Sequence, residues 1–197
     1  MRLRAAVCVI ALAVTTPSAL AQFNPSWDPG DRFRGGGPAS SGGIGYGMSG
    51  SPVPRQTVSL SASYPPGTIL ISTSERRLYY MNGDGTAIRY GIGVGRDGFT
   101  WAGVKQVTAK KEWPSWTPPA QMLRRRPDLP RFMPGGPDNP LGARALYLGS
   151  TLYRIHGSNE PDTIGQAVSS GCFRMTNEDV VDLYNRTRVG ARVIVQR

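Results

Sequence analysis

Histidine and cysteine are scarce in this chain, whose 197 residues include one histidine and two cysteines. Counting therefore excludes a zinc site built from four Cys and His ligands. No apolar run approaches the roughly 20 residues that a membrane-spanning helix needs, so a multipass membrane protein is excluded as well. Acidic residues are also few, 13 against 23 Lys and Arg, and the formal charge is +10.

Glycine and proline are plentiful, with 25 and 17 residues respectively. Together they make up about a fifth of the chain, where average usage is near 12%. Turns and irregular segments must therefore be frequent, which weighs against a helical bundle.

The first 21 residues have the pattern of a secretory signal peptide. Arg2 and Arg4 form a basic start, residues 5–14 form a ten-residue apolar core, and Ala19 and Ala21 supply the small residues before a cleavage site. This pattern predicts export with cleavage after Ala21. The apolar core is about half as long as a membrane anchor requires.

Removal of this signal leaves a mature chain with one cysteine, Cys172, and a charge of +8 because Arg2 and Arg4 are lost. A single cysteine forms no internal disulfide, and an unpaired thiol is a liability in an oxidising compartment. Its retention favours a chemical role. The alternative is an inert, buried cysteine that acts as a small hydrophobic residue.

Two parts of the mature chain differ in composition. Residues 22–63 are rich in Gly, Pro and Ser without apolar periodicity, which predicts a flexible linker. Order is expected to begin near Tyr64, and residues 64–197 are predicted to form one compact domain of ordinary size.

This domain is predicted to be mainly β with one or two short helices. The Asn82–Gly85 segment predicts a hairpin turn, and Thr176 is the expected N-cap of a helix of about three turns. A shorter helix is expected near 120–125. β-Branched and aromatic residues predict strands at 68–72, 77–81, 87–90, 92–95, 104–110, 145–148, 152–155 and 192–195.

Residues 112–140 contain Trp113, Trp116 and eight prolines. A long irregular segment inside a compact domain is usually a functional loop, so a lid is expected here. The two tryptophans either line a binding groove or pin the loop to the body of the domain.

His156, the only histidine, follows an apolar strand and precedes Cys172 by sixteen residues. A free thiol, with a pKa of about 8.5, needs a nearby base to act as a nucleophile near neutral pH. Histidine is the side chain best suited to take that proton and return it to a leaving group. A structural role for a lone histidine is the alternative.

The segment 155–157 together with 169–175, which reads Ser-Ser-Gly-Cys-Phe-Arg-Met, resembles the signature of the L,D-transpeptidase catalytic domain family (YkuD or ErfK/YbiS). The resemblance extends over about residues 64–197 and includes the Trp-Pro-Ser-Trp-Thr-Pro-Pro segment at 113–119. It implies a β-sandwich of the L,D-transpeptidase type with a Pro/Trp-rich lid. Many members have His where this chain has Ser170, which leaves His156 as the only imidazole available as a base.

The resemblance implies a peptidoglycan L,D-transpeptidase that uses no metal or organic cofactor. Cys172 would attack a tetrapeptide stem and release D-Ala, His156 would protonate the leaving group, and an amine would resolve the thioester into a 3→3 cross-link. The expected substrate and oxyanion residues are Gly157, Ser169, Gly171 and Arg174. An ion pair, for instance with Asp179, is the alternative role for Arg174.

The expected partners are peptidoglycan stem peptides and, as an alternative acceptor, an envelope protein. Export argues against nucleic acid, and no basic amphipathic helix supports stable membrane insertion. The expected location is the periplasm or cell envelope. Water as acceptor would make an L,D-carboxypeptidase, a protein lysine would make an anchoring enzyme, and an inactive wall-binding module is the non-enzymatic alternative.

Overall fold

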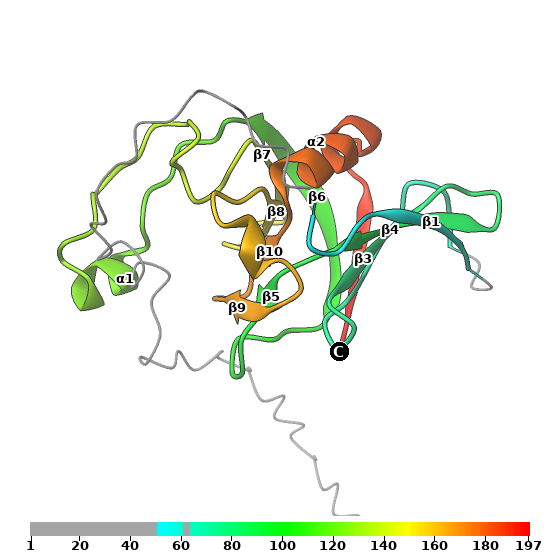
Figure 1. Ribbon diagram of the computed structural model, residues 1–197, viewed down its shortest axis with the longest axis horizontal. Coiled ribbons are helices and arrows are strands. Elements are labelled where there is room, and N and C mark those ends of the chain that lie inside the picture. Colours follow the sequence, from blue (N-terminus) through cyan, green and yellow to red (C-terminus); the bar gives the residue numbers. More distant parts are fainter. Residues whose placement is uncertain (1–50, 61–63) are drawn as a thin grey trace, which may run out of the picture.

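The computed structural model describes residues 51–60 and 64–197. The predicted signal peptide and most of the predicted linker lie outside these residues. The described chain is mainly β with two α-helices, as predicted (Figure 1). Its elements are β1 (Gln56–Ser59), β2 (Ile69–Ser72), β3 (Arg77–Met81), β4 (Thr86–Gly91), β5 (Val94–Gly95), β6 (Gly103–Glu112), α1 (Ala120–Arg125), β7 (Arg144–Leu148), β8 (Arg154–His156), the 3-10 turn η2 (Pro161–Thr163), β9 (Ala167–Ser169), β10 (Phe173–Arg174), α2 (Asn177–Arg186) and β11 (Arg192–Gln196).

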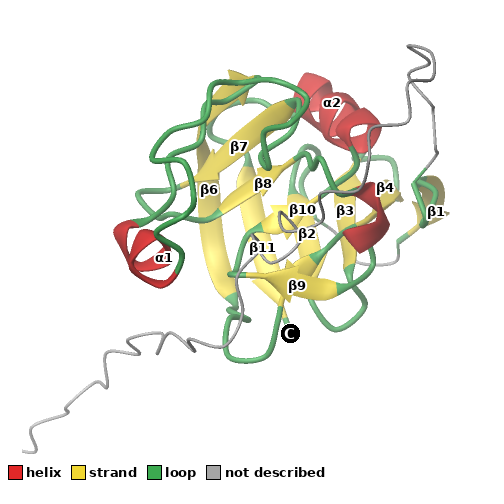
Figure 2. Cartoon of the chain, turned by 60° about the vertical axis from the view of Figure 1, so that its left-hand side comes forward, coloured by secondary structure: helices red, strands yellow, loops and turns green. Residues whose placement is uncertain are grey.

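Nine strands form one sheet in the order β1-β4-β3-β2-β11-β6-β7-β8-β10. Most neighbours are antiparallel, but β11 runs parallel to β2, and β10 runs parallel to β8. β5 and β9 form a separate two-stranded parallel sheet. Figure 2 shows β8, β10 and β9 in the middle of the molecule, beneath α2.

Strand β6 joins the two halves of the large sheet. It pairs with β11 through residues 103–106 and with β7 through residues 107–112, and its register with β7 shifts between Val107 and Ala109. A bulge of this kind bends a strand and increases its twist. The main core contains residues of both halves, such as Val193 and Leu146, so the predicted sandwich is built from one curled sheet.

Helix α2 covers the half of the sheet that contains β7. Its N-cap is Thr176, whose Oγ1 accepts a hydrogen bond from the Asp179 amide at 3.2 Å, as the sequence pattern predicts. At the other end, Lys110 Nζ donates to the carbonyls of Tyr184 and Thr187, both at 2.6 Å. A strand residue thus satisfies carbonyls that the helix end leaves unpaired.

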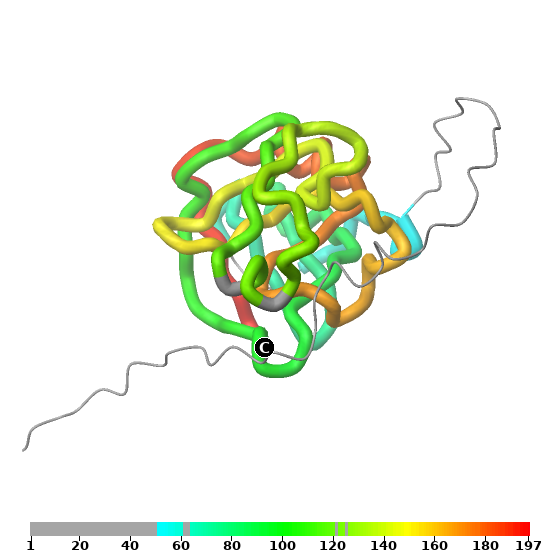
Figure 3. The backbone as a smooth tube through the Cα atoms, turned by 90° about the vertical axis from the view of Figure 1, so that its left-hand side faces the viewer, coloured from blue at the N-terminus to red at the C-terminus, as the bar shows by residue number. Residues whose placement is uncertain are grey.

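The segment between β6 and β7 forms an ordered lobe beside the sheet (Figure 3, green to yellow). Trp116 and Met133 exchange two backbone hydrogen bonds of 2.8 Å across the lobe. Asn139 is buried, and its Nδ2 donates to the Pro134 carbonyl at 2.9 Å. The two bonds therefore hold the lobe together from within through the backbone of Trp116, while Trp113 is 44% exposed.

Strand β1 corrects the prediction that residues 22–63 are linker throughout. Its residues pair with β4, in a register that places Gln56 opposite Arg89, and Arg89 Nη2 donates to Gln56 Oε1 at 2.6 Å. Val58 packs on a second apolar cluster around Leu70. A four-residue polar strand has no periodicity to reveal it, because the open edge of β4 supplies its hydrogen-bond partners.

Candidate active site

His156 and Cys172 lie at one end of the large sheet, on neighbouring strands. His156 ends β8, and Cys172 immediately precedes β10, which pairs in parallel with β8 so that Arg174 lies opposite His156. Extending this register by two residues places Cys172 opposite Arg154. Side chains alternate along a strand, so Cys172, Arg174, Arg154 and His156 share one face of the sheet.

The imidazole of His156 is buried and electrically neutral. Burial lowers its pKa to about 3, with the charges of Arg174 and Arg154 acting in the same direction and the hydrogen bond to Gly157 opposing them. His156 Nδ1 lies 2.6 Å from the Gly157 carbonyl oxygen. Since a carbonyl only accepts, Nδ1 carries the proton and Nε2 is left as the basic atom.

Burial raises the pKa of the Cys172 thiol. The positive charge of Arg154, a hydrogen bond from the Arg154 backbone and the charge of Arg174 each lower it in part. Sγ lies 3.6 Å from the Leu152 carbonyl oxygen, to which the thiol donates. The resting pair is therefore a thiol with a neutral imidazole, so the thiol proton must leave during the attack on a substrate.

The loop before Cys172 is braced by Ser169. Its Oγ donates to the Cys172 carbonyl at 2.5 Å and accepts from the Gly171 amide at 3.2 Å. Ser169 is buried, and its hydroxyl is occupied within the loop. The Gly171 amide is engaged too, which leaves the Cys172 amide as the candidate donor to an oxyanion.

Comparison with known proteins decides the family. The model of the YkuD family, the L,D-transpeptidase catalytic domain, matches residues 66–195. The chain belongs to the YkuD family.

Two curated relatives come from Escherichia coli (strain K12). This chain is 41% identical over 134 residues to the probable L,D-transpeptidase ErfK/SrfK, covering 64% of this chain and 42% of that protein. It is 40% identical over 149 residues to the probable L,D-transpeptidase YbiS, covering 72% of this chain and 47% of that protein. The chain thus spans less than half the length of these relatives.

Solved structures support the fold. An L,D-transpeptidase from Mycobacterium smegmatis superposes with a TM-score of 0.54 at 16% identity, covering 66% of this chain and 58% of that chain. L,D-transpeptidase 3 from Mycobacterium tuberculosis gives a TM-score of 0.52 at 20% identity, covering 68% and 62%. At these identities the likeness concerns the fold alone.

Gly157 of this YkuD domain packs three segments together behind His156. A Cβ at this position would lie 2.3 Å from Asn177 Oδ1 and 3.0 Å from the Ala143 amide. Asn177 Oδ1 accepts a hydrogen bond of 2.8 Å from that amide, which ties the start of α2 to the end of the lobe. The tight contacts at Gly157, which was expected among the substrate and oxyanion residues, are therefore made with other parts of the protein.

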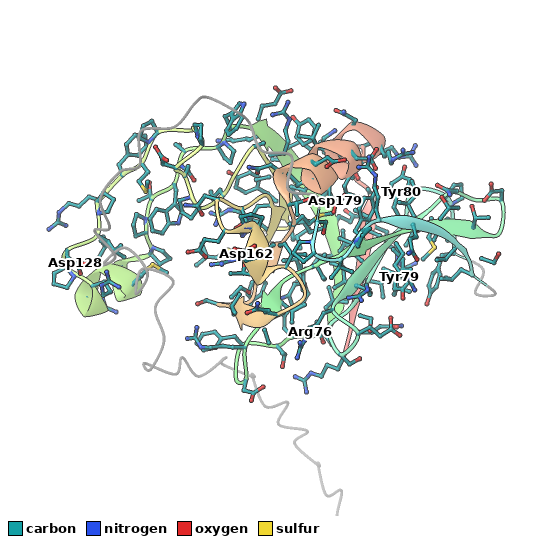
Figure 4. All side chains as sticks on the ribbon, viewed as in Figure 1. Arg76, Tyr79, Tyr80, Asp128, Asp162 and Asp179 are labelled. Carbon is teal, nitrogen blue, oxygen red and sulfur yellow. The ribbon has the colours of Figure 1, made fainter. Side chains whose placement is uncertain are left out.

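Arg174 is buried and forms an ion pair with Glu160, with Nη1 and Oε2 2.9 Å apart. The ion pair considered as the alternative role for Arg174 is therefore present, but its partner is Glu160 and not Asp179, whose carboxylate lies 3.5 Å from Arg55. Asp179 belongs to α2, where Figure 4 labels it. Arg174 nevertheless contributes positive charge near both His156 and Cys172.

Trp101, which no sequence pattern singles out, also supports the cysteine loop. Its Nε1 donates to the Gly171 carbonyl at 2.9 Å, and its ring stacks on Tyr153 with 4.7 Å between centroids. The two residues that share this hydrogen bond are 70 positions apart, so no local sequence pattern predicts the contact. Among the described residues, no group of three or more His, Cys, Asp and Glu could hold a metal ion.

Gly171→Ala is expected to slow alkylation of Cys172 by iodoacetamide at least about 10-fold and to lower the free energy of unfolding by about 1–3 kcal/mol. Its φ is +103°, and a Cβ would lie 2.6 Å from Tyr153 Cε1, so the loop must shift. Gly190→Ala is the matched control, with φ at +89° and no heavy atom within 4 Å of its Cβ. Equal alkylation rates in the two variants would contradict this account of the loop.

Proposed function

We propose that this chain is a peptidoglycan L,D-transpeptidase in which Cys172 is the nucleophile and His156 the general base. The proposal is supported by the position of His156 at the end of β8 and of Cys172 directly before β10, the strand that pairs in parallel with β8, within a YkuD domain. The two Escherichia coli relatives are named as probable L,D-transpeptidases, which supports the same reaction.

The reaction begins when Cys172 Sγ attacks the carbonyl between the third and fourth residues of a tetrapeptide stem. His156 Nε2 takes the thiol proton as the C–S bond forms, and the Cys172 amide faces the oxyanion. Collapse of the tetrahedral intermediate breaks the C–N bond, and His156 returns the proton to the amine of departing D-Ala. A thioester remains on Cys172.

The second half-reaction needs an amine. The side-chain amine of a second stem attacks the thioester, and His156 accepts the proton that this amine loses. As the C–S bond breaks, the Cys172 thiolate leaves and takes that proton back from His156. The product is a 3→3 cross-link, and the enzyme returns to its resting state. Cys172 and His156 act through bond-making and proton transfer in both halves, without a cofactor.

The pH dependence follows from the lowered pKa of His156 and the raised pKa of Cys172. His156, with a pKa of about 3, stays an unprotonated base throughout the neutral range. The raised pKa of Cys172 means that alkylation by iodoacetamide increases with pH through a pKa above the ordinary thiol range, without an inflection between pH 5 and 7. A plateau of fast alkylation below pH 6 would instead indicate a preformed thiolate–imidazolium pair and would contradict the resting state of a thiol with a neutral imidazole.

Three alternatives differ in whether Cys172 is acylated and in which acceptor resolves the thioester. Water as acceptor makes the chain an L,D-carboxypeptidase, a protein lysine makes it an anchoring enzyme, and no acylation makes it a wall-binding module.

The test is incubation of the purified protein with disaccharide-tetrapeptide, and mass spectrometry of the products. Dimers that have lost one D-Ala, with a 3→3 bond, support the transpeptidase, tripeptide alone supports the carboxypeptidase, and binding to sacculi without any product supports the module.

The same proposal includes export to the periplasm or cell envelope, where the substrate lies. It is supported by the signal pattern in residues 1–21. As a separate finding, none of the helices within residues 51–60 and 64–197 has the length and hydrophobicity of a membrane span. N-terminal sequencing of protein recovered from the envelope fraction is expected to begin at Gln22. Recovery of an intact N-terminus from the cytosol would contradict export.

A further inference from the structure

Arg154 lies beside the proposed nucleophile without having a part in the reaction described so far. It is the first residue of β8, two positions before His156, and its place in the parallel register is opposite Cys172. On its other side β8 pairs with β7, where Tyr147 lies opposite Arg154. Arg154 therefore lies on the same face of the sheet as His156 and Cys172, in the position between Cys172 and Tyr147.

The guanidinium of Arg154 is held by an aromatic ring, and no carboxylate in the described part of the chain forms an ion pair with it. Its Cζ lies 5.1 Å from the centroid of the Tyr147 ring, a cation–π distance. Its Nε is buried and has no hydrogen-bond partner within residues 51–60 and 64–197. Arg174, on the same face, differs because it already has a carboxylate partner in Glu160.

A buried donor without an acceptor costs free energy, and an arriving ligand recovers that cost. Arginine presents its N–H groups in a planar fork that matches a carboxylate. A second cation lies nearby, since Lys111 Nζ is 5.8 Å from the same Tyr147 ring. The positive charge of Arg154 also acts at Cys172, so a carboxylate bound here would lie close to the reacting sulfur.

We propose that Arg154 binds a carboxylate of the peptide stem and so positions the scissile carbonyl for attack by Cys172. The inference rests on the proposed function and names the feature of the acyl donor that this site selects. The stem offers two such groups beside the scissile bond: the free carboxylate of a diamino-acid third residue and the terminal carboxylate of the departing D-Ala. Both offer the same chemistry to the guanidinium.

The first test uses the thiol alone and needs no transpeptidase activity. Iodoacetate and iodoacetamide alkylate a thiolate in the same way but differ in charge, so the ratio of their rates reports an anion site. Arg154→Met is expected to lower the iodoacetate rate by about 10-fold or more relative to the iodoacetamide rate. Rates are compared on the alkaline plateau of each variant, where the thiolate fraction is equal.

Two further variants make this test decisive. Arg154→Lys, which keeps the charge, is expected to restore most of the iodoacetate preference. Arg192→Met, at an exposed position of β11, removes the same charge far from β8 and is expected to leave the ratio unchanged. Thermal unfolding curves establish that both proteins are folded. If the ratio of the iodoacetate rate to the iodoacetamide rate is then the same in wild type and Arg154→Met, the proposal is overturned.

The second test identifies the carboxylate. Stems amidated at the third-residue carboxylate, or at the terminal D-Ala, are compared with the unmodified stem in wild type and Arg154→Met. The KM of the variant is expected to rise about 10- to 100-fold for stems that carry the recognised carboxylate and to stay unchanged for the stem that lacks it. An equal loss on all three stems would contradict carboxylate binding. A wild-type protein that turns over no stem would refute the proposed function. If its rate ratio still favours iodoacetate in an Arg154-dependent way, the anion site at Arg154 is supported all the same.

Discussion

Cys172→Ala is expected to abolish formation of both the acyl-enzyme and the cross-linked product, a loss of at least about 10⁴-fold in rate. The proposed thioester is made with Cys172 Sγ, and residues 22–197 contain no second cysteine to replace it. The side chain is half-buried and its hydrogen bond to the Leu152 carbonyl is long, so the variant is expected to remain folded. The measurement is the yield of 3→3 dimers from disaccharide-tetrapeptide.

Binding provides the control for this variant. Cys172→Ala is expected to pull down sacculi as well as the wild type does, because the stem-binding face is unchanged. A variant that still yields dimers at the wild-type rate would show that the chemistry lies elsewhere. If Cys172→Ala keeps the full biological effect of the wild type, and neither protein yields a product, the wall-binding module is favoured.

His156→Gln is expected to slow acylation of Cys172 by about 10²–10⁴-fold at pH 7, the range usual for loss of a general base. Because the lowered pKa of His156 keeps it neutral, its proposed function is to take the thiol proton during attack rather than to hold a thiolate beforehand. The loss is therefore expected to shrink as the pH rises and the thiol ionises by itself. Acylation rates of the variant and the wild type, monitored by mass spectrometry from pH 6 to 10, measure this convergence.

Alkylation by iodoacetamide on its alkaline plateau is the control for His156→Gln, since it needs a thiolate and no proton acceptor. The variant is expected to match the wild type there. A deficit in acylation that stays constant across the pH range would indicate that His156 supports the structure of the loop and is not the base.

Much of the fold was predictable because its strands are locally encoded. Runs such as Ile69–Ser72 and Arg192–Gln196 are rich in β-branched residues, and the turn at Asn82–Gly85 has strong hairpin chemistry. Strand β1 was missed because its pairing depends on the open edge of β4. The curl of the sheet depends on a bulge in β6 that leaves no mark in the sequence.

In the candidate site, too, some residues are indicated by local sequence patterns and others only by the fold. His156 and Cys172 were found by scarcity, spacing and resemblance, and their catalytic roles remain predictions. The supporting contacts of Trp101 and Glu160 were not predicted, because each bond joins residues that the fold alone brings together. Ser169 and Gly171 were predicted as substrate or oxyanion residues, whereas their hydrogen bond to each other occupies both groups within the loop.

The intact mass of the protein after brief exposure to a tetrapeptide stem tests the central claim most directly. The account predicts an increase equal to the mass of the stem less one D-alanine, located on Cys172 by peptide mapping and absent from Cys172→Ala. Such an adduct would establish the thioester before any question of the acceptor arises. Release of D-alanine by the wild type with no adduct at any time, and equal release by Cys172→Ala, would contradict it.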